Sequence, residues 1–371
     1  MGVRQAVARL AVSRVHVLTV EVPGHWTTRC ALQRQMVDRG WRDALSAADA
    51  DVLAVCGSPG PELAGLVDRI WDQLPGPRVR VEVIGPPSVS SGLDRAAVGL
   101  LDDDRQRADA RSRPQRPDIV NDENHGEDDH ADMDQGDMDH GPMDMAPEGI
   151  PLARGSEDRD GLKMDSLHLR LGPVLPYWPP ALVIRCSING DVITDARAGL
   201  VDAERHGNPS EPASLGGSVL AARECDHIHN LLALAGWPRG AGIARRSRDL
   251  LLSDDHANAV RLLHGLQHSV RRSMLLRWSL RGVGTLTREE LDARALPAAL
   301  EGDAYTGLLQ RLDVAGDLAS HASTANPLRV DTQAGLDALP HLVGGLDIAT
   351  ARLAVAALGM ETSLYAKART P

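Results

Sequence analysis

The chain has 371 residues, of which 43% are hydrophobic, so it is long enough for two folded domains with ordinary cores. Its formal net charge is −11, and eleven Asp and Glu residues fall between Asp122 and Glu148. The rest of the chain is therefore near neutral, which does not favour free nucleic acid as a partner. There is no Phe, and Arg greatly outnumbers Lys, a residue usage typical of GC-rich genomes.

The cysteine pattern and the lack of recognisable targeting signals favour a reducing compartment such as the cytoplasm. The four cysteines lie singly at positions 30, 56, 186 and 225, which is typical of reduced thiols. Residues 1–22 lack the apolar core of a signal peptide, and no apolar run in the chain is long enough to span a membrane. We therefore expect a cytoplasmic protein.

One acidic stretch separates the two ends of the chain. Residues 121–151 read NDENHGEDDHADMDQGDMDHGPMDMAPEGIP, too charged to bury a core, so we expect a disordered linker over 101–160. Imidazole, thioether and carboxylate groups are ligands for copper, nickel or zinc. The candidate ligands are His125, His130, Met133, Met138, His140, Met143 and Met145. A loose metal-binding segment and a solvated linker both remain open.

The first module, residues 1–100, alternates strands with helices. Alternating β-branched residues and helical periodicity predict strands at 14–22, 50–56 and 79–84 and helices at 27–39 and 62–74. This order predicts an α/β fold with a small parallel, doubly wound sheet. The loops 22–28, 57–61 and 85–92 should then lie together at the carboxyl edge of the sheet. The Gly57 loop has the geometry to cradle an anion, although a turn alone explains its composition.

The second module, residues 161–371, is expected to be α+β, a β-hairpin followed by a helical bundle. Strands are predicted at 167–171, 181–187 and 191–196, and Asn189-Gly190 is a strong hairpin signal. Helices are predicted at 218–235, 255–280 with a break near Gly265, 287–291, 304–319 and 336–358. Thr287 and Glu290 have the spacing of a capping box.

The run ADADVLAVCGSPGPELAGLVDRIWDQLPGPRVRVEVIG resembles the small subunit of respiratory complex I and of nickel–iron hydrogenases. That subunit carries the iron–sulfur cluster nearest the active site, and the resemblance places Cys30 at its first cluster cysteines. A tetranuclear cluster needs four thiolates. Cys56 falls where the family has a small residue, and no later cysteine follows Gly85 in this module. Cys30 is thus the single candidate cofactor ligand, and we expect no iron–sulfur cluster.

Three further segments resemble, in the same order, the large quinone-site subunit of these complexes. They are LGPVLPYWPPALVIRCSINGDVITDA, ARECDHIHNLLALAG and LRWSLRGVGTLTREEL. Leu175 stands where that family has its quinone-facing histidine, and the CxxC pairs that bind nickel are missing. His264 and His268 have i, i+4 spacing but no apparent third metal ligand, while His227 and His229 point to different helix faces.

Three functions remain open. The resemblance implies a hydrophilic subunit of a complex I-like or energy-converting-hydrogenase-like NADH/quinone oxidoreductase, in a cofactor-poor structural or assembly role beside antiporter-like membrane subunits. The alternatives are an active redox subunit with a quinone or hydrogenase-like site, and a metal-binding protein that acts through its linker. No catalytic residue is assigned. If the two modules dock, loops 22–28 and 85–91 should meet loop 172–180, with Trp26 and Trp178 at the contact.

Overall fold

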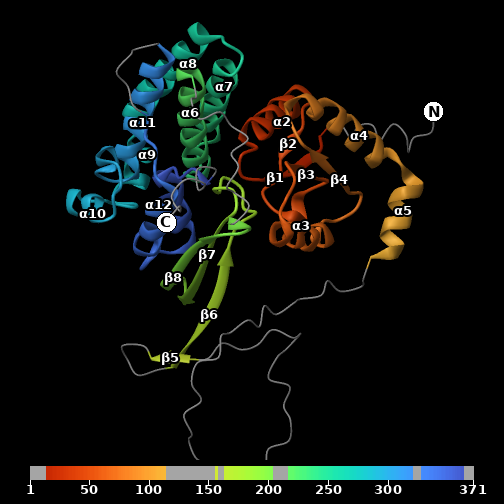
Figure 1. The fold of residues 1–371 in the computed structure, drawn as a ribbon, viewed down its shortest axis with the longest axis horizontal. Coiled ribbons are helices and arrows are strands. Elements are labelled where there is room, and N and C mark those ends of the chain that lie inside the picture. Colours follow the sequence, from red (N-terminus) through yellow and green to blue (C-terminus); the bar gives the residue numbers. More distant parts are fainter. Residues whose placement is uncertain (1–13, 114–154, 158–162, 204–215, 321–326, 363–371) are drawn as a thin grey trace, which may run out of the picture.

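The computed structural model describes residues 14–113, 155–157, 163–203, 216–320 and 327–362. It has two modules that lie side by side (Figure 1). The first contains a parallel sheet, and the second contains an antiparallel sheet and many helices. No helix among these residues is both long and apolar enough to cross a bilayer.

The parallel sheet has helices on both faces, as the alternation of strands and helices predicts. Its strands lie in the order β2-β1-β3-β4, and every strand pair is parallel. They are β1 (His16–Glu21), β2 (Arg42–Asp43), β3 (Val52–Cys56) and β4 (Val79–Val83). Helices α2 (Trp26–Asp38) and α4 (Val89–Leu101) pack on one face, and α3 (Pro61–Gln73) packs on the other.

The first module continues past residue 100, where the sequence predicted the linker to begin. Helix α5 (Asp103–Ser112) buries none of its residues, so it carries no apolar periodicity by which it could be recognised. Polar contacts hold it: Arg78 Nη2 donates to Asp109 Oδ1 at 3.0 Å, and Gln106 Nε2 donates to the Gly99 carbonyl at 2.8 Å. Likewise, the expected loop 85–92 is mostly a 3₁₀ turn and the first turn of α4.

The antiparallel sheet confirms the predicted hairpin. Its strands are β5 (Gly155–Glu157), β6 (Lys163–Leu171), β7 (Leu182–Asn189) and β8 (Val192–Leu200), in that order across the sheet. The turn between β7 and β8 places Gly190 at φ 63°, in the left-handed region that glycine adopts without strain.

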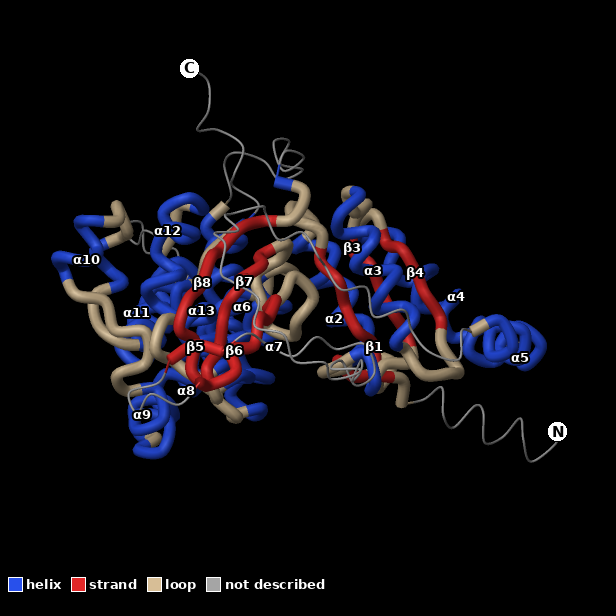
Figure 2. The backbone as a smooth tube through the Cα atoms, turned by 90° about the horizontal axis from the view of Figure 1, so that it is seen from below, coloured by secondary structure: helices blue, strands red, loops and turns tan. Residues whose placement is uncertain are grey.

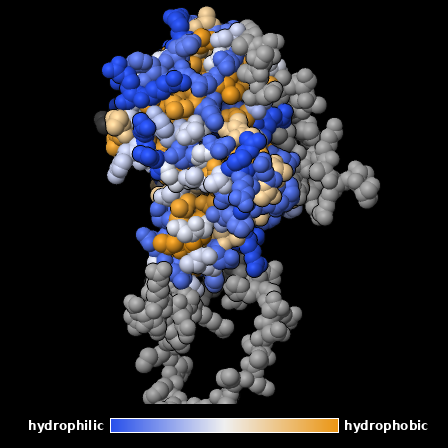
Figure 3. All heavy atoms as spheres, turned by 90° about the vertical axis from the view of Figure 1, so that its left-hand side faces the viewer, coloured by the Kyte–Doolittle hydropathy of each residue, from blue (hydrophilic) through white to orange (hydrophobic). Residues whose placement is uncertain are grey.

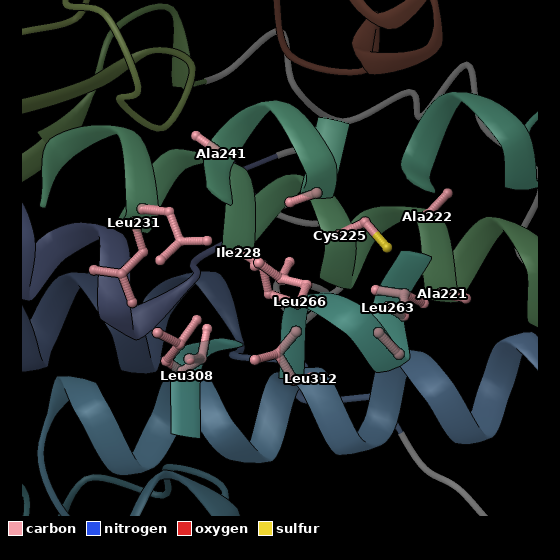
Figure 4. Packing of buried hydrophobic residues seen from close by; sticks show 14 of the residues in the cluster. Ala221, Ala222, Cys225, Ile228, Leu231, Ala241, Leu263, Leu266, Leu308 and Leu312 are labelled. Carbon is pink, nitrogen blue, oxygen red and sulfur yellow. The ribbon is translucent and has the colours of Figure 1, made fainter. Parts of the chain in front are cut away.

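Eight helices follow in the described part of the second module. They are α6 (Gly217–Leu234), α7 (Pro238–Leu251), α8 (His256–Arg272), α9 (Met274–Leu280), α10 (Arg288–Ala293), α11 (Ala304–Ala319), α12 (Thr332–Val343) and α13 (Ile348–Leu358). Residues of α6, α7, α8 and α11 form one apolar core, in which Cys225, Ile228, Leu266 and Leu308 lie close together (Figure 4). A second core joins β7 and β8 to α12 and α13.

Helix boundaries differ from the predictions where a cap decides them. The helix predicted over 255–280 breaks at Ser273 and not at Gly265, because Ser273 Oγ accepts from the Leu276 amide at 3.2 Å and starts α9. The helix predicted over 336–358 is two helices, since Asp347 caps α13. The capping box of Thr287 and Glu290 is confirmed.

Candidate functional site

A cleft of about 130 Å³ lies between the two modules. The first module lines it with β1, Pro23, Trp26 and Arg29, and the second lines it with loop 173–180, α6 and the chain after α13. Loops 22–28 and 172–180 therefore face each other across the cleft, and Val22 and Val174 belong to one apolar cluster. The loop 85–91 is not among the described residues that line the cleft, and Pro86–Ser88 packs against α2 instead. Figure 2 shows the two modules side by side.

Apolar packing and one helix cap join the modules. Val174, Val183 and Val201 of the second module are part of the apolar cluster under the α3 face of the parallel sheet. Next to them, Asp202 Oδ1 and Oδ2 accept from the Glu62 and Leu63 amides at 3.1 and 3.0 Å. A carboxylate from one module thus caps a helix of the other, where the helix dipole favours negative charge.

Asp226 on α6 is the centre of a buried polar network between the modules. Its carboxylate accepts from Trp26 Nε1 at 3.0 Å, from Arg29 Nη2 at 2.5 Å and from Arg248 Nη1 at 2.7 Å. Arg29 also pairs with Glu21 at the end of β1, and Gln33 accepts from both guanidinium groups. We call these residues the Asp226 network; its members are Glu21, Trp26, Arg29, Gln33, Asp226 and Arg248.

The network keeps its charges because each one has a partner. Burial raises the pKa of Asp226, but the adjacent Arg29 and Arg248 outweigh burial and hold that pKa well below its usual range. Burial lowers the pKa of Arg29, and the carboxylates of Asp226 and Glu21 raise it well above the ordinary value. Asp226 is only 5% exposed and Arg248 is fully buried, so water screens these charges little.

Cys30, the candidate cofactor ligand, lies next to this network. It is 1% exposed and packs, with Trp26, into the helical core of the second module. Burial raises the pKa of its thiol to about 12, and burial also raises the pKa of Cys56 well above its ordinary value. Both thiols are therefore protonated at neutral pH, and a protonated thiol is neither a good nucleophile nor a metal ligand.

The donor set at Cys30 does not fit a tetranuclear iron–sulfur cluster. Such a cluster needs four thiolates, whereas the charged neighbours of Cys30 are the guanidinium groups of Arg29 and Arg248 and the carboxylates of Asp226 and Glu21. Across the described ranges, no group of three or more His, Cys, Asp and Glu side chains is arranged to hold a metal ion. The linker candidates His125, His130, Met133, Met138, His140, Met143 and Met145 lie outside the described residues.

A second charged group lines the same cleft near the end of the described chain. Glu361 lies 3.6 Å from Arg223 Nη1 and 3.8 Å from His227 Nε2, and the Arg223 guanidinium stacks 4.4 Å above the Trp26 ring. Burial raises the pKa of Glu361, but His227 and Arg223 lower it overall to about 2. Trp26 thus contacts both charged groups.

The remaining histidines considered in the sequence analysis are His229, which is buried, and His264 and His268, which are exposed. His229 is 5% exposed, its Nδ1 donates to the Ala241 carbonyl at 2.9 Å, and its ring meets Tyr177 edge-on at 5.6 Å. Burial and the charge of Arg248 lower the pKa of His229 to about 4, so it is neutral at pH 7. His264 and His268 are exposed on α8, and they belong to no three-ligand group in the described chain.

Sequence reasoning missed the Asp226 network, although two signals point to it. Trp26, Arg29 and Gln33 recur at helical spacing, so they share one face of α2. On α6, the charged Arg223, Glu224 and Asp226 lie among core-forming residues, and all three are buried. Glu224 pairs with buried Arg311 at 2.7 Å, which stabilises the same helix from its other side. A charged residue within a core-forming helix is informative because burying it requires a partner.

No protein-family model matches the chain, and no curated protein sequence matches it. The chemistry of the site therefore follows from its own residues. Paired guanidinium and carboxylate groups hold two modules together with their charges fixed at neutral pH, and protonated thiols add apolar packing.

Proposed function

We propose that this chain is a cofactor-poor structural or assembly subunit of a membrane-bound oxidoreductase of the complex I or energy-converting hydrogenase type. In this role it joins a small-subunit-like module and a large-subunit-like module in one chain. It presents both to membrane subunits of the antiporter-like kind, on the inner face of the cell membrane. Electron transfer takes place in other chains of the assembly.

The observation that carries this proposal is the Asp226 network beside Cys30. The resemblance places Cys30 at the first cluster cysteines of the small subunit. In this chain the contact between the modules holds the guanidinium groups of Arg29 and Arg248 beside Cys30, paired with Asp226. These side chains bind the modules to each other with charge-assisted hydrogen bonds, while burial raises the pKa of the Cys30 thiol beside them. Such a contact favours a scaffold over an electron carrier.

Isolation of the native assembly tests this role. The full chain would be tagged in its own host, and membranes would be solubilised in mild detergent before size-exclusion chromatography and mass spectrometry. We expect the chain to migrate in a large complex with stoichiometric antiporter-like membrane proteins. The proposal is wrong if the native chain migrates alone, or if its complex lacks any such membrane protein.

A variant of the contact gives the matched control for that isolation. Asp226→Asn removes the charge that pairs with Arg29 and Arg248, whereas Asp313→Asn removes a carboxylate from an exposed pair with Arg271. If docking of the modules presents the binding surface, the first variant should lower the yield of the complex severalfold and the second should not. Equal yields from both variants would contradict a role for the docked arrangement.

A further inference from the structure

Helix α9 packs one side into the helical core and exposes large apolar side chains on its other side. Leu276 and Leu280 are buried in the helical core, at 4% and 0% exposure. On the other side of the same short helix, Met274, Leu275 and Trp278 are 76%, 73% and 79% exposed. Their i, i+1 and i+4 spacing places them on one face. Trp278 is the most exposed large apolar residue in the described chain.

Positive charge surrounds this apolar face. Between His256 and Arg288 the sequence contains six arginines and no Asp or Glu, although the whole chain has a net charge of −11. Three exposed arginines flank or lie on α9: Arg272 ends α8, Arg277 lies within α9, and Arg281 follows its last residue. Arg271 is also exposed and pairs with Asp313 at 3.1 Å. The charge of α9 is thus opposite to that of the chain as a whole.

The location of α9 leaves this face accessible. The helix lies beside α11 on the left-hand side of Figure 1, and Figure 3 views that side, where orange apolar patches lie among blue polar ones. Contacts of α9 are with α8 and α11, which hold its buried side. We define the α9 surface as Met274, Leu275, Trp278, Arg272, Arg277 and Arg281.

The composition of the α9 surface decides which kind of partner it fits. A second copy of the chain would need a contact of roughly 800 Å² per partner, far more than three side chains supply. A bilayer surface needs no complementary shape: it takes Trp and Leu side chains at the level of the headgroups and attracts Arg to anionic lipids. Three protruding apolar side chains with arginines around them match that partner in both hydropathy and charge.

We propose that the α9 surface is a contact site for an anionic lipid bilayer. Leu275 and Trp278 insert at the headgroup level, and Arg272, Arg277 and Arg281 contact lipid phosphates. This contact is made to lipid directly, so it does not depend on the membrane proteins of the proposed assembly. Vesicles of pure lipid therefore test it separately from the proposed function.

Co-sedimentation of the full-length protein with vesicles tests the proposal. Vesicles of phosphatidylcholine, with and without phosphatidylglycerol, are the two probes. We expect binding to the anionic vesicles only, weakening as salt is added, together with a blue shift of tryptophan emission. No binding to either vesicle, or equal binding to both, would overturn the proposal.

Two double variants separate the contribution of the arginines to vesicle binding from that of the apolar side chains. Arg277→Gln with Arg281→Gln should weaken binding roughly 25-fold, at about fivefold for each arginine near an anionic surface. Leu275→Ser with Trp278→Ser should abolish the blue shift and weaken binding at least about tenfold. All four side chains are exposed, so the variants should keep the parent thermal unfolding temperature. Wild-type binding by both folded variants would overturn the proposal.

Matched controls exclude general effects of charge and hydropathy. Val98 on α4 is 69% exposed, so Val98→Ser removes an exposed apolar side chain elsewhere. Arg239 and Arg246 are exposed on α7, so their double change to Gln removes the same charge from another helix. Both controls should bind anionic vesicles as the wild type does. A loss in the controls as large as in the α9 variants would overturn assignment to the α9 surface.

Discussion

Asp226 shows how one buried carboxylate can join two modules. It accepts hydrogen bonds from Trp26 and Arg29 of the first module and from Arg248 of its own. A buried ion pair gains little over an apolar contact, because both charges lose their hydration. Its removal is costly for the same reason, since the partner charge stays buried without compensation. The network therefore specifies which faces meet more than it adds stability.

Asp226→Asn should lower the free energy of unfolding by up to ~3–5 kcal/mol, because the buried Arg29 and Arg248 would lose their shared counter-charge and keep only Glu21 and Asp249 as partners. Denaturation in urea measures the difference. Asp313→Asn is the control, since its pair with Arg271 is about half exposed and should contribute less than ~1 kcal/mol. Similar losses in the two variants would show that the Asp226 network is not buried as described.

His229 should make stability depend on pH. Its pKa is about 4 in the folded chain, below the ordinary value of 6.5, because burial and Arg248 disfavour the charged imidazole. The unfolded chain therefore binds a proton first as the pH falls. The stability contributed by neutral His229 is present above pH 6.5 and is lost between pH 6.5 and pH 4, by up to a few kcal/mol.

His229→Asn tests this pH dependence, because an asparagine amide can still donate to the Ala241 carbonyl but does not titrate in this range. Unfolding free energies at pH 7, 6 and 5 should fall less steeply in the variant than in the wild type. Parallel curves for the two proteins would mean that other groups cause the loss of stability in acid.

Helix α7 illustrates which elements the sequence predicts and which it does not. The long apolar period of α11 and the capping box of α10 are local signals, and both predictions were confirmed. Helix α7 was missed because it packs through small residues: a Cβ at Gly240 would lie 3.2 Å from Leu232 Cδ1 of α6. Such close packing against α6 is visible only in three dimensions.

The sequence predicted two parts of the site, the Cys30 position and the loops at the contact, but not the pairing of its charged residues. The resemblance indicated Cys30, and the turn-rich loops indicated the contact beside Trp26. The pairing of Arg29 with Asp226 joins residues 197 positions apart in sequence, and that of Gln33 with Arg248 joins residues 215 apart. Whether a charged residue is buried depends on tertiary packing, and the hydrophobic periodicity of a single sequence does not reveal that packing.

Asp202 gives a test of the cap that one module supplies to the other. Asp202→Ala should cost ~1 kcal/mol and raise hydrogen exchange in the first turn of α3, because the Glu62 and Leu63 amides lose their acceptor. Asp303→Ala is the control, since Asp303 caps α11 within its own module. The control should raise exchange in the first turn of α11 and at Gly282, and leave α3 unchanged. Unchanged exchange in α3 after Asp202→Ala would contradict the cap.

The two modules should unfold together, since residues of the first module belong to the core of the second. Trp26→Ala removes a side chain that is 4% exposed and contacts both charged groups of the cleft. It should cost ~3–5 kcal/mol and lower hydrogen-exchange protection in α2 and α6 alike. Trp178→Ala should instead weaken the second module, because the Trp178 indole donates to the Leu182 carbonyl. Protection lost in α2 alone after Trp26→Ala would contradict joint unfolding.

The absence of a cluster at the contact between the modules is the central claim of the proposed function. Iron and acid-labile sulfide should be measured in the full chain purified anaerobically from its own host, beside a variant that lacks residues 121–150. We expect neither iron nor sulfide in stoichiometric amount in either protein, because Arg29, Asp226 and Arg248 surround the buried Cys30 thiol. Stoichiometric iron with sulfide in both would contradict the scaffold role and make this chain a redox subunit.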